Sequence, residues 1–324
     1  CIDGLNFYNY TSFVHTDRKS LLKVILTLFV TLSLIPVSLA DVSPIKNNIK
    51  NSFNNKINSK INAATAAASE KISTFAKENF ENIKYLDFSI QGQEELKPTF
   101  SIMSVNEILK INSGTIFNQS SFNNHDGDQT INIGFGTRKL ISDNKVLLGS
   151  NIFYDHQFNN SHKRAGAGVE AISSVFDVRG NYYNALSGRK NVKEGGIERA
   201  LDGWDTQLDY HLPIKHDVSI FLNAFEFENP ENGSDYKETG NKMGLNARLG
   251  HFLIEAGYMD DNQENDSYFG NIKFVINMGE EKIQNSKNFL EYTDVSDKLY
   301  QPVKRENKIR LVKISAAGVV AGGF

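Results

Sequence analysis

Cysteine is almost absent from this sequence of 324 residues, in which the single cysteine is Cys1. A lone cysteine provides no disulfide framework and no Cys-x-x-Cys zinc or redox motif. Once an N-terminal leader is removed, no thiol nucleophile remains either. Charge of one sign is also lacking, because 35 Lys and Arg stand against 38 Asp and Glu, a net charge of −3. That balance argues against nucleic acid as a partner, since phosphate binding needs an excess of basic groups.

Long apolar runs are lacking too, apart from one near the N-terminus. The mean hydropathy of −0.37 excludes a bundle of membrane-spanning helices, because each such helix needs about 20 apolar residues. It does not exclude a transmembrane β-barrel, in which only alternate residues of a strand face lipid.

The apolar run, residues 24–35, follows a basic segment at residues 18–23 and precedes the small residues Ser38 and Ala40. This order predicts a secretory signal peptide that is cleaved after Ala40, and therefore Sec-dependent export. The first residue is not Met, so we take residues 1–40 as a signal peptide with an irregular upstream extension. The alternative is an N-terminal membrane anchor.

Residues 41–82 have a helical period. Apolar residues recur four positions apart at Ile45, Ile49, Phe53, Ile57 and Ile61. The period predicts a periplasmic helical segment, which serves either as a spacer or self-association helix or as a plain leader to the main domain.

From residue 83 to residue 278 the period changes to two. For example, Trp204 and Leu208 alternate with Asp205 and Asp209, so that charge lies on one face of the strand. We expect twelve strands, near residues 83–92, 98–108, 114–122, 129–139, 145–157, 163–172, 175–186, 203–212, 217–227, 242–249, 251–259 and 267–278. Most are close to the ~10 residues of a tilted membrane strand.

The connections between these strands alternate in length. Long polar connections follow odd-numbered strands, at residues 123–128, 188–202, 228–241 and 260–266. Short turns follow even-numbered strands, at residues 141–144, 173–174, 213–216 and Gly250. A soluble sandwich has no reason to sort its connections in this way, whereas an outer-membrane barrel has short periplasmic turns and long surface loops. The predicted fold class is all-β: a twelve-stranded antiparallel transmembrane β-barrel with a short N-terminal helical segment and a C-terminal pore-threading helix or linker.

Two sets of residues are expected to mark the two faces of the barrel. Aromatic residues near strand ends fit interface girdles in contact with outer-membrane lipid: Phe153, Tyr154, Phe158, Tyr182, Tyr183, Trp204, Tyr210, Tyr258, Tyr268 and Phe274. The alternative for some of them is ordinary packing in a core. The predicted lumen-lining residues are Asn151, Asp155, Arg164, Gly166, Gly168, Glu170, Asp177, Arg179, Asp205, Asp209, Lys242, Arg248 and Lys273. Gly166 and Gly168 would leave room at the inner wall for a passing chain.

Several motifs in series resemble the translocator domain of the intimin/invasin family, the inverse autotransporters. They are Leu-Gly-Ser-Asn-Ile-Phe-Tyr-Asp at residues 148–155, Arg-Ala-Gly-Ala-Gly-Val-Glu at 164–170, Gly-Trp-Asp at 203–205 and Tyr-His-Leu-Pro at 210–213. The resemblance covers about residues 83–313. It implies a barrel in the outer membrane of a Gram-negative bacterium, whose C-terminal segment returns through the pore and exports a passenger for adhesion or host-cell entry. It implies no catalysis and no cofactor. The implied partners are periplasmic chaperones, the barrel-assembly machinery and, through a passenger, a host-cell receptor.

The tail agrees with this resemblance. The pore-linker pattern consists of Pro302, Val303, Arg305, Asn307 and Ile309. We therefore expect residues 279–313 to form a helix and linker through the pore. Its basic residues, Lys304, Arg305, Lys308 and Arg310, are expected to meet luminal carboxylates such as Asp155, Glu170 and Asp205. Residues 314–324 contain no passenger domain, so we expect either a truncated start of a passenger or a tail left by passenger loss.

Two other functions were weighed. The first is a twelve-stranded diffusion channel, which would need no linker after its last strand. The second is a hydrolase with a Ser-His pair. His156 and His211 lie in predicted strands, but Ser150 is about 20 Å from His156 along its strand, so we expect both histidines to be rim or lumen residues. No two histidines have the spacing of metal ligands.

Overall fold

The computed structural model describes residues 82–94, 96–191, 196–214, 217–231, 233–263, 266–278, 291–315 and 318–320. The predicted signal peptide and the predicted helical segment up to residue 81 lie outside this range, as do residues 279–290 of the predicted pore segment. Within the described ranges, no helix combines the length and the apolarity needed to cross a membrane.

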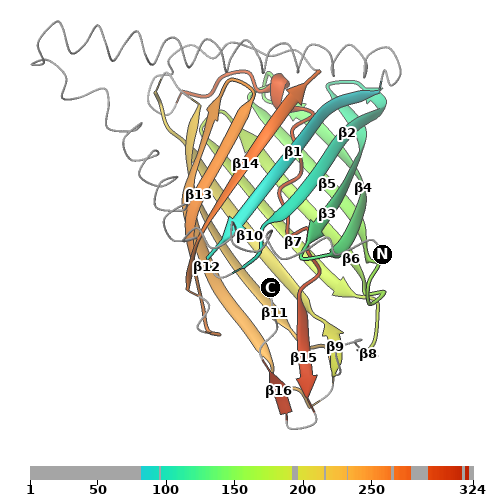
Figure 1. Ribbon diagram of the computed structural model, residues 1–324. Coiled ribbons are helices and arrows are strands. Elements are labelled where there is room, and N and C mark those ends of the chain that lie inside the picture. Colours follow the sequence, from blue (N-terminus) through green and yellow to red (C-terminus); the bar gives the residue numbers. More distant parts are fainter. Residues whose placement is uncertain are drawn as a thin grey trace, which may run out of the picture.

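Twelve strands form one closed antiparallel barrel (Figure 1), which confirms the predicted fold class. They are β1 (Ile83–Gln93), β2 (Thr99–Ile111), β3 (Gly114–His125), β4 (Asp128–Ile141), β5 (Val146–Gln157), β6 (Lys163–Ser173), β7 (Phe176–Ala185), β10 (Asp202–His211), β11 (Val218–Glu228), β12 (Lys237–Leu249), β13 (Phe252–Asp261) and β14 (Ser267–Asn277). The predicted ranges agree closely with these bounds. The largest difference is at β12, which begins at Lys237 instead of residue 242.

The barrel closes where β1 pairs with β14, in a register that runs from Tyr85 opposite Asn277 to Gln93 opposite Phe269. Closure leaves no strand edge unpaired, and it satisfies the peptide groups that lipid cannot hydrogen-bond.

A second, four-stranded sheet lies at one end of the barrel. It consists of β8 (Lys190–Asn191), β9 (Ile197–Ala200), β15 (Leu311–Ser315) and β16 (Gly318–Val320), in the order β16-β15-β9-β8. Residues 188–202 were therefore predicted wrongly as a loop alone. Strand β9 is only four residues long, and its partner β15 lies far away in the sequence, so no local period marks it.

The two ends of the barrel differ in their connections. One end carries tight turns such as residues 142–145 and Gly250, and we call it the short-turn end. The opposite end carries the second sheet, and we call it the loop end. The predicted polar loop at residues 123–128 belongs to the loop end but is a two-residue turn. His125 pairs with Asp128, and both turn residues have positive φ, Asp126 at 52° and Gly127 at 89°. An Asp-Gly pair suits this hairpin turn.

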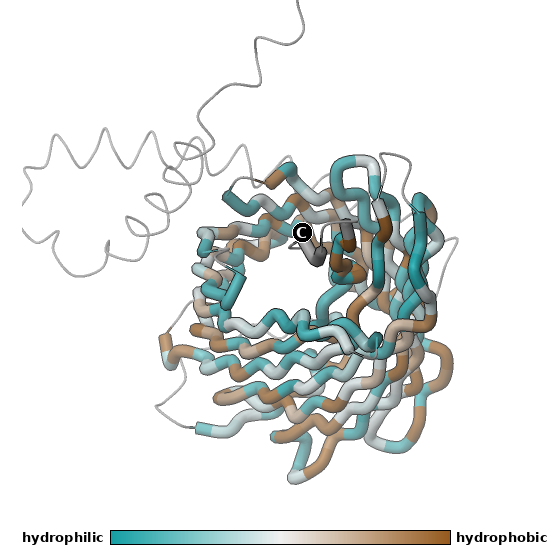
Figure 2. The backbone as a smooth tube through the Cα atoms, turned by 90° about the horizontal axis from the view of Figure 1, so that it is seen from below, coloured by the Kyte–Doolittle hydropathy of each residue, from teal (hydrophilic) through white to brown (hydrophobic). Residues whose placement is uncertain are grey.

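Alternation along the strands separates an outer face from an inner face of the barrel. Figure 2 shows the barrel end-on. Val169 and Ile152 point outward and are 64% and 63% exposed, as lipid-facing residues should be. The interior is only partly polar, because aromatic side chains such as Phe117 and Phe153 are buried inside it. Phe153 and Tyr183 therefore do not belong to the outer aromatic girdles predicted from sequence.

Candidate functional site

Residues 291–311, which we call the linker, run through the interior of the barrel from the short-turn end to the loop end (Figure 1). At the short-turn end, the Val295 N–H donates to the carbonyl oxygen of Asn144 at 2.8 Å. At the loop end, Leu311 pairs with Ala200 of β9. The described part of the linker is extended apart from one 3-10 turn at Ser296–Lys298. Residues 279–290, the other part of the predicted helix and linker, lie outside the described residues.

An extended strand without strand neighbours needs other partners for its peptide groups. Gln119 of β3 supplies two of them. Its Oε1 accepts from the Val303 N–H at 2.7 Å, and its Nε2 donates to the Val303 carbonyl at 3.3 Å. The side-chain amide thus pairs with the linker as a neighbouring strand would.

Luminal side chains of β4 and β7 bind further peptide groups of the linker. We call this set of hydrogen bonds between side chains and the linker backbone the substitute ladder. The Asn132 amide donates to the Asn307 carbonyl at 2.9 Å, and the Asn181 amide donates to the Lys304 carbonyl at 3.1 Å. Arg138 holds the linker near the short-turn end by donating to the carbonyl of Leu299 at 2.9 Å and to that of Gln301 at 2.5 Å.

Asp155 of β5 is the centre of the charged contacts, and it is fully buried. Arg305 of the linker binds both of its oxygens, with distances of 2.8 and 2.7 Å. Arg164 of β6 donates to Oδ2 at 2.7 Å, and Asn132 donates to Oδ1 at 2.7 Å. A bidentate pair of this kind fixes both the position and the orientation of the linker side chain.

Two aromatic rings complete the binding site of the Arg305 side chain. Its guanidinium lies 4.2 Å from the ring centroid of Phe153 and 5.4 Å from that of Tyr183. The Tyr183 hydroxyl donates to Asp205 at 2.5 Å and accepts the Glu306 N–H at 2.8 Å. The two inward aromatic residues therefore bind the linker.

Other linker cations find partners that the sequence did not identify. Lys304 pairs with Asp209 at 2.8 Å, and Arg310 pairs with Glu238 of β12. The other two expected carboxylates form no ion pair with a linker cation among the contacts described. Glu170 pairs with Arg138 at 2.6 Å, within the wall, and Asp205 accepts hydrogen bonds from Asn181 and Tyr183.

The two luminal glycines serve different neighbours. A Cβ on Gly166 would lie 3.1 Å from Nη2 of Arg305, so this glycine leaves room for the linker. A Cβ on Gly168 would lie 2.5 Å from Oδ1 of Asn181, so its space is filled by a side chain of the wall instead.

All thirteen predicted lumen-lining residues lie on the inner face, but on two different sides. Those on β5–β7 and β10 form one side with Gln119, Asn132, Arg138, Asn181 and Tyr183, and we call it the linker wall. Lys242, Arg248 and Lys273 lie on the other side, next to cavities. Gln119, Asn132, Arg138 and Asn181 were not among the predicted lumen-lining residues, although their inward phase in the two-residue alternation marked them.

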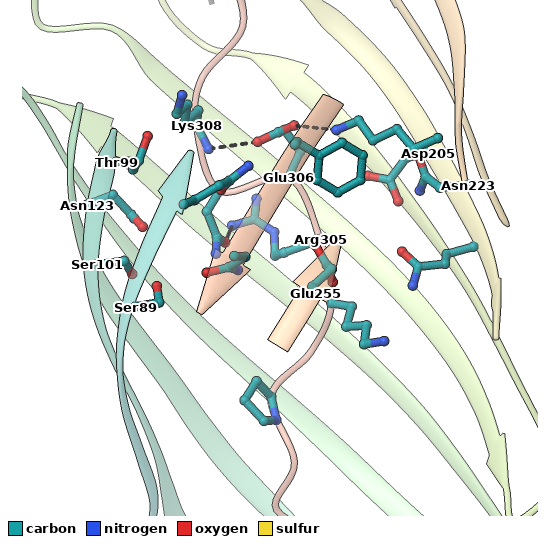
Figure 3. Close-up of a pocket in the computed structure, with 18 of the residues that line it drawn as sticks. Ser89, Thr99, Ser101, Asn123, Asp205, Asn223, Glu255, Arg305, Glu306 and Lys308 are labelled. Atoms are coloured by element: carbon teal, nitrogen blue, oxygen red, sulfur yellow. Dashed lines mark hydrogen bonds and ion pairs between the residues drawn. The ribbon is translucent and has the colours of Figure 1, made fainter. Parts of the chain in front are cut away.

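The opposite side, which we call the open wall, is formed by the luminal faces of β1, β2 and β11–β14. A cavity of about 210 Å³ separates it from the linker. Figure 3 shows Ser89, Ser101, Asn223 and Glu255 around this cavity, with Glu306 of the linker facing it. The linker therefore lies along one wall without filling the lumen.

The predicted rim or lumen histidines have no catalytic partners among the contacts described. His156 stacks outside the barrel between Tyr154 and Phe158, and the His211 ring nitrogen lies 3.0 Å from Asp177. Over the described residues, no group of three or more His, Cys, Asp or Glu is arranged to hold a metal ion.

Known proteins are similar to this chain in sequence and in fold. A family model described as inverse autotransporter, beta-domain, matches residues 38–307. An attaching and effacing protein homolog of Escherichia coli (strain K12) is 32% identical over 36% of this chain and 40% of its own length. The inverse autotransporter adhesin YeeJ of the same organism is 29% identical over 30% of this chain and 4% of its own.

Invasin of Yersinia enterocolitica is 29% identical over 31% of this chain and 12% of its own length. The chain thus spans less than half the length of these curated relatives. A solved structure from a study of the in-meso crystallization of membrane proteins has a TM-score of 0.60, with 21% identity over 70% of this chain and 98% of that chain. At this level of identity, the likeness shows the fold.

Proposed function

This chain belongs to the inverse autotransporter β-domain family, and on that premise we propose that it exports a passenger polypeptide through its own pore. The barrel is an outer-membrane barrel of the translocator and adhesin kind. In the proposed function, the short-turn end faces the periplasm and the loop end faces the outside. The polypeptide that follows the linker acts in adhesion or host-cell entry.

One observation carries this proposal: the linker crosses the lumen with its peptide groups bonded to luminal side chains. Inside a bilayer, a chain that is neither helical nor part of a closed sheet is tolerated only where protein or water satisfies its backbone. Gln119, Asn132 and Arg138 do this for the linker. A lumen built only for diffusion has no need of them.

The ion pairs explain how the linker would stay in place after export. Arg305 is held by Asp155 and Lys304 by Asp209, both on the linker wall. Release would leave these buried charges without partners, which is costly. The open wall contributes fewer linker contacts among the described residues, chiefly the ion pairs of Arg310 with Glu238 and of Glu306 with Lys242. A cavity remains between this wall and the linker, so the export path keeps free space beside the anchored chain.

The proposal includes the steps that bring the chain to the membrane. Signal-directed Sec export, periplasmic chaperones and the barrel-assembly machinery would deliver and insert it, and a host-cell receptor would bind the passenger. No catalytic step is proposed for any residue.

An epitope tag after Phe324 tests the direction of export. On intact cells, antibody should bind this tag, whereas a tag between Ser173 and Ser174 should become accessible only after permeabilisation. A tag at residues 231–233 serves as the positive control for the loop end. Labelling of the Ser173 tag alone on intact cells would overturn the proposed direction.

Cross-linking tests the path of the linker. With Cys1→Ser as background, Asn307→Cys should cross-link to Asn132→Cys and much less to Ser89→Cys on the open wall. Deletion of residues 291–324 should raise the ion conductance of the reconstituted barrel. Equal cross-linking to both walls, with conductance unchanged by the deletion, would favour the diffusion channel instead.

A further inference from the structure

Lys298 anchors the linker at the short-turn end of the barrel. It ends the 3-10 turn of the linker and is buried, with 9% of its surface exposed. An ammonium group has three donors, and three acceptors surround the Lys298 Nζ. They are the Ser173 carbonyl at 2.6 Å, Asp177 Oδ1 at 3.4 Å and His211 Nε2 at 3.0 Å. The number of acceptors thus equals the number of donors.

The His211 Nε2 atom lies between two groups of opposite charge. It is 3.0 Å from Nζ of Lys298 in the linker and 3.0 Å from Oδ2 of Asp177 on β7. Without a proton, Nε2 has a lone pair and accepts a hydrogen bond from the ammonium group. With a proton, it is a donor and binds only the carboxylate. The protonation of one atom therefore decides whether His211 bonds to the linker or to the barrel wall.

Protonation of His211 also changes the electrostatics of the anchor. Two positive groups then lie 3.0 Å apart. The Asp177 carboxylate contacts both of them and offsets part of their repulsion. Lys298 keeps the Ser173 carbonyl but loses one of its three acceptors. A buried ammonium group with an unused donor is costly, so the hold of the wall on the linker weakens.

Protons can reach His211 through a cavity of about 440 Å³ at this end of the lumen, which His211 lines. Imidazole is the only side-chain group whose unperturbed pKa gives a change of charge between about pH 5 and pH 8. His211 is the one imidazole among the described residues that line this cavity. Besides Asp177 and Lys298, the ionisable groups that line it are Tyr85, Arg179, Asp217, Arg248, Lys273, Asp297 and Lys304.

We propose that His211 is a positioning residue for the linker, and that its protonation releases Lys298 and loosens the linker at the short-turn end. In the proposed function, this end is the periplasmic entrance of the export path. The inference rests on that function only for its consequence, which is that acid frees the anchored chain at the entrance while the contacts of Arg305 deeper in the lumen persist.

Hydrogen exchange of the purified full chain in lipid vesicles tests this switch. The N–H groups of Lys298, Leu299 and Gln301 bond to carbonyls of the linker itself, so they report on the short-turn end. From about pH 8 to about pH 5, their exchange rates, corrected for intrinsic rates, should rise about tenfold. That is the effect of one lost hydrogen bond to a charged group. Exchange of the Val303 N–H, which is bonded to Gln119, should stay unchanged.

Three variants assign the response. In His211→Gln, the amide oxygen can still accept from Lys298 but does not titrate, so exchange should stay slow at both pH values. Lys298→Met keeps the apolar stem and removes the cation, so exchange should be fast at both pH values. His156→Gln, on the outer face of β5, is the matched control and should keep the response of the wild-type chain. Heat-modifiable migration on gels checks that each variant is folded.

Equal corrected rates at both pH values in the wild-type chain would overturn the proposal. A response that persists in His211→Gln or in Lys298→Met would overturn it too, because another group would then titrate. So would a response shared by Val303, because the whole lumen would then loosen. The purified protein exports nothing in this assay, so such a failure leaves the epitope-tag test of export unaffected.

Discussion

The linker wall and the open wall have the same strand geometry but different chemistry. The linker wall presents buried charges and amides, such as Asp155, Arg138 and Gln119, each bonded to the linker. The open wall presents Ser89 and Ser101 to a cavity, together with charged residues such as Glu255 and Lys273 that make no described contact with the linker. The pore therefore does not hold its linker by filling the space around it. Most hydrogen bonds and ion pairs of the linker go to the linker wall, and Arg310 adds an ion pair with Glu238 on the open wall.

The largest expected difference between the walls concerns Asp155. Asp155→Ala leaves Arg164 and Arg305 buried without their common carboxylate, so we expect it to cost about 3–5 kcal/mol of unfolding free energy. The measurement is denaturant unfolding of the reconstituted barrel. Glu255→Ala on the open wall is the control and should stay within about 0.5 kcal/mol of the parent. Equal losses at the two positions would erase the distinction between the walls.

Gly166 tests the close approach of Arg305 to the linker wall. Gly166→Val adds atoms where a Cβ already lies 3.1 Å from the guanidinium. We expect a loss of about 1–3 kcal/mol from overpacking, and a higher ion conductance as the linker is displaced. Ser89→Val adds similar bulk next to the cavity and should be nearly neutral in both measurements. A neutral Gly166→Val would mean that the glycine is not needed for the linker.

Substitution of Asn181 tests a single hydrogen bond of the substitute ladder. Asn181→Ala removes its bonds to the Lys304 carbonyl and to Asp205. We expect a loss of about 1 kcal/mol in the same unfolding assay. Hydrogen exchange should also quicken at residues near the lost rung, 304–306. Asn223→Ala, beside the cavity, should change neither quantity, and a matching effect there would count against the ladder.

Much of this architecture could be predicted from sequence, because a period of two along each strand assigns faces without any knowledge of contacts. Asp155 and Arg164 were identified in this way, and the linker motif around Arg305 came from the family resemblance. Phe153 and Tyr183 were assigned to the lipid interface although they share the inward phase of Asp155 and Asn181. Position near a strand end was given more weight than phase, and phase was the better guide.

The pairings could not be predicted, since they depend on how the closed barrel brings distant strands together. Arg310 pairs with Glu238, and Glu170 pairs with Arg138 instead of with a linker cation. Strand β9 has no period of its own and forms only with β15 as its partner. Sequence alone therefore predicted part of the lining of the pore, while the rest of the lining and its division into two walls required the structure.

The smallest expected effect lies beyond the barrel, where β9 receives the emerging linker. Glu198 of β9 lies 3.6 Å from the ring nitrogen of His162 and accepts a hydrogen bond from Asn160 at 2.8 Å. The neighbouring His162 ring lowers the pKa of Glu198 below its ordinary value of 4.5. A lowered carboxyl pKa stabilises the fold above the unfolded-state value, and this stability is lost as the pH falls through the folded-state pKa.

Hydrogen exchange at Leu311–Ile314, corrected for intrinsic rates, should therefore quicken as the pH falls below about 4.5, the reference value for the unfolded carboxyl. Glu198→Gln should remove this acid dependence, because the amide does not titrate. Exchange at β13, which has no contact with Glu198 among those described, is the internal control. An acid response that persists in Glu198→Gln would assign it to another group. A response shared by β13 would mean that the whole barrel opens at low pH. Strand β9 would then be no less stable than the two walls.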